Sequence, residues 1–215
     1  TTAWRIFAVF IAVIASFILR PFPIGMMVLT GLVILIASGT ITIEESLSGF
    51  ADSTVWLVVA AFLLAGAMIN TGLGKRIALW LVIKLGKTIK GLAYAICGSE
   101  FILATVMPSN TARGGGIHAP IVNSMAHSLG SHQSHKPDRA GVFLTLVGAH
   151  ANLIAAAMFM TGLAANPIVT KAVKDIYNID FGWGTWALGA IVPGVVSLLL
   201  LPHVIAMLAP PKIKD

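Results

Sequence analysis

The sequence predicts an all-α, polytopic membrane protein with a re-entrant helical hairpin and a broken transmembrane helix. The chain is 57% hydrophobic and only 10% charged, whereas about a quarter of the residues in a soluble globular domain are charged. Its apolar residues form several runs close to the roughly 20 residues that cross a bilayer as a helix. Lys and Arg lie between these runs instead of clustering, so the net charge of +6 indicates a bilayer rather than a nucleic acid as partner.

The first part of the chain, residues 1–74, is predicted to hold transmembrane helices that belong to a scaffold. Apolar segments at 4–19, 24–38 and 55–69 approach the length of a membrane span. The polar stretch 40–53 lies between the second and third segments, and we expect it to be an exposed loop.

The central part of the chain is predicted to be an interfacial helix followed by a hairpin. Residues 75–90 combine apolar side chains with Lys75, Arg76, Lys84, Lys87 and Lys90, which is typical of an amphipathic helix on the membrane surface. Residues 91–130 have two apolar halves, 92–107 and 117–129, split by the polar, glycine-rich turn 108–116. Each half is short for a span, and both flanks are basic, so the segment should enter and leave on the cytoplasmic side. This predicts a re-entrant hairpin whose Ser-Asn-Thr turn forms the tip.

The last part is predicted to contain a broken transmembrane helix and a final span. Residues 131–182 hold an apolar stretch that polar residues and glycines interrupt, namely Gly148, Asn152, Thr161, Gly162 and Asn166. Freed backbone groups at such interruptions commonly line binding sites in membrane proteins. Residues 183–215 are interpreted as the last transmembrane helix, 183–208, and a cytoplasmic tail.

The positions of the basic residues support this course through the membrane. It places ten basic residues in the cytoplasm and three outside, in agreement with the positive-inside rule. The cytoplasmic residues are Arg20, Lys75, Arg76, Lys84, Lys87, Lys90, Lys136, Arg139, Lys212 and Lys214, and the outer ones are Arg5, Lys171 and Lys174.

Four short blocks carry a resemblance to a known family. They are Leu-Ser-Gly-Phe at 47–50, Thr-Gly-Leu-Gly-Lys-Arg-Ile-Ala at 71–78, Pro-Ser-Asn-Thr-Ala-Arg-Gly-Gly at 108–115 and Ala-Ala-Asn-Pro at 164–167. Together they resemble the divalent anion:sodium symporter family, most of all its citrate/succinate and 2-oxoglutarate/malate translocator branch. The likeness implies an inverted-repeat transporter of small di- and tricarboxylates, not an enzyme. Only one Ser-Asn-Thr is present and the chain begins on Thr1, so we interpret it as the first repeat, cut at its N-terminus.

The resemblance also implies which residues form the site. In the family the first hairpin tip holds a substrate carboxylate, which here assigns substrate binding to Ser109, Asn110 and Thr111. A sodium site would use Thr105, Ser109, Asn110 and the carbonyl of Ala156. No cofactor is expected, and Na⁺ is the ion that the resemblance allows. It further implies a homodimer of the complete protein in a cell inner membrane or an organelle inner envelope.

Arg113, next to the tip, is predicted as a further substrate-binding residue. An Arg inside a membrane domain is costly and either pairs or binds substrate, so structural pairing with Glu100 is the alternative. If its charge stayed unpaired, the empty carrier would reorient unfavourably and the protein would exchange one anion for another. Ala155-Ala156 replaces the family's Gly-Gly beside the expected sodium carbonyl, which favours exchange as well, with sodium symport as the alternative.

An intramembrane enzyme and a membrane scaffold are the more distant alternatives to a transporter. The chain has no HExxH, GxSxG or phosphate-binding loop motif, which argues against an intramembrane enzyme. A membrane scaffold would require that Ser-Asn-Thr merely caps a helix. The histidines, including His118, are expected to be packed or interfacial, and Asn152 to form hydrogen bonds between helices.

Overall fold

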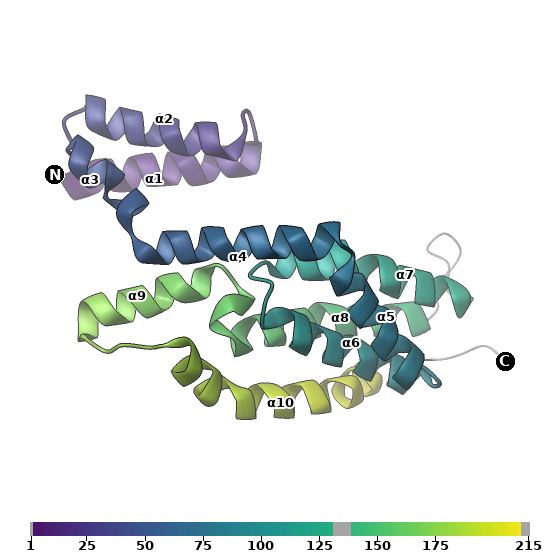
Figure 1. Cartoon of the computed structure of the whole chain (residues 1–215). Helices are drawn as coiled ribbons and strands as arrows, with labels where there is room; N and C mark the ends of the chain where they lie inside the picture. Colours follow the sequence, from purple (N-terminus) through teal and green to yellow (C-terminus); the bar gives the residue numbers. More distant parts are fainter. Residues whose placement is uncertain (1, 131–138, 212–215) are drawn as a thin grey trace. The chain divides into compact units, whose positions relative to one another are not determined.

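The computed structural model describes residues 2–130 and 139–211, and every regular element in these ranges is a helix, as predicted (Figure 1). The chain divides into two compact units, residues 1–56 and 57–215. Four helices of the described residues are long and apolar enough to cross a membrane: Thr2–Leu19, Ser53–Asn70, Ala140–Met158 and Trp183–Leu208. The predicted spans 4–19, 55–69 and 183–208 are therefore confirmed as helices, while the 14-residue α2 is shorter than a span.

The first unit is built on a hairpin of α1 (Thr2–Leu19) and α2 (Ile24–Ala37). Pro21 and Pro23 separate the two helices, because proline lacks the N–H group that would continue a helix. Gly31 lets them approach closely, since a Cβ added there would lie 2.7 Å from Val13. Large apolar side chains on the outside, such as Ile18 at 79% exposure, suit a lipid environment.

The polar stretch 40–53 is exposed but is not an irregular loop. It contains a short helix, α3 (Ile43–Leu47), and the 3₁₀-helix η1 (Ser48–Ala51). The Thr42 hydroxyl accepts a hydrogen bond from the N–H of Glu45, and the Glu45 carboxylate accepts one from the N–H of Thr42. This capping box satisfies two free donors at the helix start and explains the difference from the expectation.

In the second unit, α4 (Ser53–Asn70) leads into α5 (Leu73–Leu85) through Gly72, whose φ of 69° requires glycine-like freedom. α5 packs against the hairpin arm that follows, and Gly74 touches Ile117 of the second arm. Its outer side carries basic groups and apolar side chains, with Lys84 lying 4.4 Å over the Trp80 ring. The helix predicted over 75–90 ends at Leu85, and the next helix begins at Ile89, while an amphipathic segment at the membrane surface stays a prediction.

The predicted hairpin is present as two helical arms joined by a turn. α6 (Ile89–Ala104) ends before the tip, and the returning arm consists of the π-helix η2 (Ala112–His118) and α7 (Ala119–Ser128). Both arms run back toward the same end of the unit (Figure 1). Within η2, Gly114 packs against Asn152, whereas a Cβ at Gly115 or Gly116 would meet nothing.

The broken helix follows, but its break lies later than expected. α8 (Arg139–Met158) runs unbroken through Gly148 and Asn152; then come the short η3 (Met160–Gly162) and α9 (Ala165–Tyr177). Gly148 serves packing instead, because it lies between Ile96 of the first arm and Val122 of the second. The break is present at Thr161 and Gly162, whereas Asn166 already lies in the first turn of α9. The interruption predicted at Gly148 and Asn152 is wrong, because both lie within the continuous α8.

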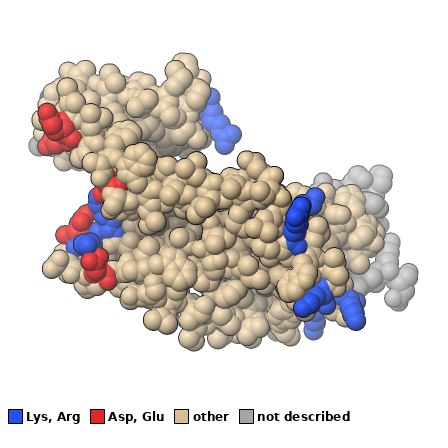
Figure 2. Space-filling view, viewed as in Figure 1, with Lys and Arg blue, Asp and Glu red and all other residues tan. Residues whose placement is uncertain are grey.

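The last helix, α10 (Trp183–Leu208), completes the second unit by packing on α8 and α6. Exposed charges differ between the two ends of the unit (Figure 2). Basic side chains gather where α5 meets α6, at Lys84, Lys87 and Lys90, whereas around α9 both Lys174 and its ion-pair partner Asp180 occur. The hairpin opens toward the basic end, as the predicted topology requires. The predicted loop around Lys136 and the tail from Lys212 lie outside the described residues.

Candidate functional site

The hairpin tip presents the three predicted substrate residues at the start of a helix. The Ser109 hydroxyl accepts a hydrogen bond from the N–H of Ala112 at 3.1 Å, which is a capping contact. The Asn110 side-chain oxygen accepts one from the N–H of Thr111 at 2.9 Å, and the Thr111 side chain is exposed. Ser109 thus caps the helix, while Asn110 and Thr111 keep polar atoms at the surface of the tip, where a ligand can reach them.

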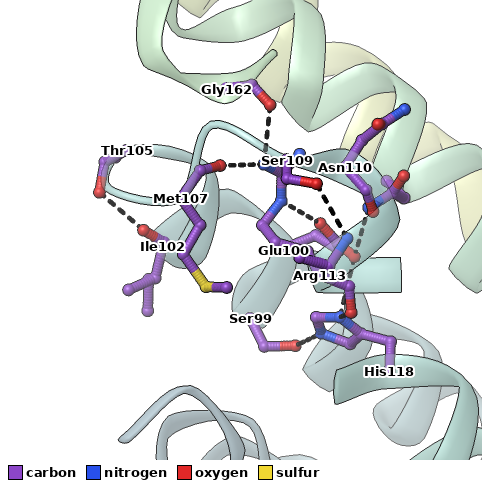
Figure 3. Close-up of polar contacts among 12 residues, drawn as sticks. Ser99, Glu100, Ile102, Thr105, Met107, Ser109, Asn110, Arg113, His118 and Gly162 are labelled. Carbon is purple, nitrogen blue, oxygen red and sulfur yellow. Dashed lines mark hydrogen bonds and ion pairs between the residues drawn. The ribbon is translucent and has the colours of Figure 1, made fainter. Parts of the chain in front are cut away.

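Arg113 lies close to the tip in sequence but points into the protein interior (Figure 3). Its side chain is fully buried, and Nε donates to Glu100 Oε2 at 3.0 Å. Nη1 donates to the backbone carbonyls of Met107, in the tip loop, and of Gly162, in the broken helix. Arg113 therefore pairs with Glu100, which is the alternative to substrate binding. Within the described residues its Nη2 has no hydrogen-bond partner.

Glu100 is the centre of this buried network. Besides Arg113, its carboxylate contacts His118 Nδ1 at 2.8 Å and accepts from Asn152 Nδ2 at 2.9 Å. Asn152 also donates to the carbonyl of Asn110 at 3.0 Å. One carboxylate therefore connects both hairpin arms, the broken helix and, through Asn152, the backbone of the tip. A buried carboxylate is tolerated only with such partners.

The network includes residues that sequence reasoning did not place together. His118 is 3% exposed, as expected for a packed histidine, but its ring also contacts Ser99 Oγ at 2.7 Å. Asn152 was expected to bond between helices and does so. The sequence offers one signal for this network: Glu100 and Arg113 are charged residues within the hairpin segment 91–130, and buried charges need neutralising partners.

The residues of the predicted cation site lie on two segments that face each other. The Thr161 hydroxyl donates to the carbonyl of Thr105 at 2.7 Å, which ties the tip loop to the break. The Thr105 hydroxyl donates to the Ile102 carbonyl, and the Ala156 carbonyl accepts from Asn166 at 2.9 Å. Carbonyl and hydroxyl oxygens are thus concentrated here, which is the donor chemistry that a hard cation takes. The Arg113 guanidinium approaches the same two segments, because its Nη1 donates to two other carbonyls, those of Met107 in the tip loop and of Gly162 in the break.

The whole chain, residues 1–215, matches the family model described as "Sodium:sulfate symporter transmembrane region". It is 45% identical over 214 residues to the "Putative malate transporter YflS" of Bacillus subtilis, covering 99% of this chain and 45% of that protein. It is 37% identical to "Dicarboxylate transporter 1, chloroplastic" of Arabidopsis thaliana, over 99% of this chain and 38% of the relative. An "L-tartrate/succinate antiporter" of Escherichia coli is 34% identical, and the match covers 99% of this chain and 47% of that protein. The chain spans about half the length of these curated relatives or less.

Proposed function

Because this chain belongs to the family of the sodium:sulfate symporter transmembrane region, and is an integral membrane protein, we propose that the complete protein transports small di- and tricarboxylate anions. The class includes malate, succinate, citrate and 2-oxoglutarate. Relatives that are named as malate, dicarboxylate and tartrate/succinate transporters support it. They include bacterial and chloroplast proteins, which agrees with an inner membrane or envelope.

The observation that carries this proposal is the accessible, donor-rich hairpin tip. Asn110 and Thr111 keep polar groups at its surface, where the helix through η2 begins. A carboxylate at a helix start meets free N–H groups and the positive end of the helix dipole. The Glu100–Arg113 pair behind the tip is formally neutral, so it would not hold a dianion irreversibly. Together these features suit an anion that must bind and leave.

Exchange of one anion for another is the mode that we propose. The support is the place of Arg113, whose Nη1 bonds carbonyls from both the tip loop and the break, and these are ligands of the kind Na⁺ would take. A guanidinium there keeps its proton and cannot dissociate. The charge of Arg113 is compensated by its pairing with Glu100, so an unpaired charge does not supply the reason for exchange. Sodium symport is the second candidate, favoured by the family description and by the oxygens around Thr105 and Ala156.

Uptake of labelled malate by proteoliposomes that contain the complete protein distinguishes the two modes. Vesicles are prepared with and without internal dicarboxylate, each with and without an inward sodium gradient. Exchange requires fast uptake only into preloaded vesicles, independent of sodium. Robust uptake into empty vesicles that needs external sodium would contradict exchange and support symport. No uptake of any dicarboxylate under any condition would contradict the transport proposal itself.

A further inference from the structure

His118 is buried in a setting that differs from simple packing. It ends the π-helix η2, and both ring nitrogens have partners. Nδ1 lies 2.8 Å from Glu100 Oε1 and 3.2 Å from the carbonyl of Arg113. Both are acceptors, so Nδ1 must carry a proton. Whether the ring is neutral or positively charged therefore depends on whether the other nitrogen, Nε2, also carries a proton.

The partner of Nε2 can serve the ring with or without a second proton. Ser99 Oγ lies 2.7 Å from Nε2 and 2.9 Å from the carbonyl of Ile96. When the ring is neutral, the hydroxyl donates to Nε2. When a proton binds at Nε2, the hydroxyl accepts the new N–H and turns its own hydrogen to the Ile96 carbonyl. Only hydrogens move, so neither charge state leaves a buried polar atom unsatisfied.

We propose that His118 is a reversible proton-binding site coupled to anion binding at the hairpin tip. The proposal rests on the proposed function, because it needs an anion at that tip. With a neutral ring, the charges of Glu100 and Arg113 cancel; the bound proton gives the cluster a net charge of +1. A positive cluster favours an anion nearby, and by linkage the bound anion favours the proton.

Hydrogen bonds connect His118 to the tip, and few other charges lie around it. His118 and Asn152 bond the same oxygen of Glu100, and Asn152 also holds the carbonyl of Asn110 in the tip. Four elements pack against η2. From α6 come Glu100, Ser99 and the buried Cys97, and from α8 comes the uncharged Asn152. α5 approaches through Gly74, and its charged residues Lys75 and Arg76 are exposed. The titratable residue of α7, His127, is also exposed. Within η2 itself the charged group is Arg113.

The test compares the complete wild-type protein with His118→Asn and with the control His150→Asn. Asn at 118 keeps a donor for Glu100 but cannot titrate. His150 is an exposed histidine of α8 whose Nδ1 contacts the Leu146 carbonyl, so its variant controls for the loss of a histidine outside the hydrogen-bonded network. Apparent affinity for malate is measured from uptake between about pH 8 and about pH 6, where an ordinary histidine titrates.

We expect the apparent affinity of the wild type and of His150→Asn to rise about fivefold or more as the pH falls, a typical size for coupled sites. His118→Asn should show only the small change that comes from malate itself. Identical pH profiles for all three proteins would overturn the proposal. Absence of malate uptake by the wild type would instead count against the proposed function.

A second measurement covers the case in which His118→Asn fails to fold. Purified wild-type protein in weakly buffered solution receives malate near the pH at which its affinity changes most. A pH indicator should report proton uptake, and at the same malate concentration this uptake should be smaller with the tip variant Asn110→Ala, which binds less malate. If malate binds the wild type without proton uptake, the proposed coupling is wrong.

Discussion

At the scale of single residues, the tip separates groups that cap the helix from groups that remain accessible. The Ser109 hydroxyl is engaged with Ala112, whereas the Thr111 side chain is exposed. Thr111→Val and Asn110→Ala should therefore weaken malate binding by about 1–3 kcal/mol each, or roughly 5- to 150-fold, because each removes a polar partner of a buried anion. Uptake kinetics in proteoliposomes with the complete protein measure this. Thr145→Val, a hydroxyl loss on the exposed side of α8, is the matched control and should leave affinity unchanged.

The buried ion pair gives a second prediction at this scale. Arg113→Gln or Glu100→Gln alone leaves one uncompensated charge in the interior, which typically costs about 3–5 kcal/mol. The double variant removes both charges and should be less destabilised than the sum of the single ones. Thermal unfolding in detergent, followed by tryptophan fluorescence, checks this. Additive losses would show that the two side chains do not act as a pair.

At the scale of elements, helix ends were more predictable than long-range contacts. The last span begins at Trp183 and ends at Leu208 as predicted, since Gly182 and Pro210 flank it. The position of the break could not be read locally. It depends on Asn166 folding back onto the carbonyls of Ala156 and Phe159, while Gly148 fits inside a continuous helix.

In the candidate site, too, local features were predictable from the sequence and long-range contacts were not. The tip residues Ser109, Asn110 and Thr111 stand together in the sequence, so a motif could point to them. The network behind them joins Ser99 to His118 and Glu100 to Asn152, which are 19 and 52 residues apart. Local patterns show that these residues are polar within apolar segments. They do not show which pairs meet, and this is why the pairing of Arg113 was left open.

At the scale of the whole molecule, the two ends of the second unit should face opposite sides of the membrane. A cysteine at Lys87, between α5 and α6, is expected to react with an impermeant maleimide only from the cytoplasm, and one at the exposed Asp175 of α9 only from outside. Ser134, another position predicted to be cytoplasmic, lies outside the described residues. Labelling of both from the same side would contradict the re-entrant hairpin. The native Cys97 is buried, so it should react slowly.

The open space beside Gly115 and Gly116 has a consequence for engineering the protein. Glycine inside a helix costs about 0.5–1 kcal/mol relative to alanine, and among the described residues no atom lies within contact distance of a Cβ added at Gly115. Gly115→Ala should therefore raise the melting temperature of the complete protein in detergent. If the hairpin needs backbone freedom to change conformation, the same substitution slows malate turnover, so heat resistance is gained as activity is lost. Gly130→Ala, at a φ of 80°, is the opposite control and should lower the melting temperature.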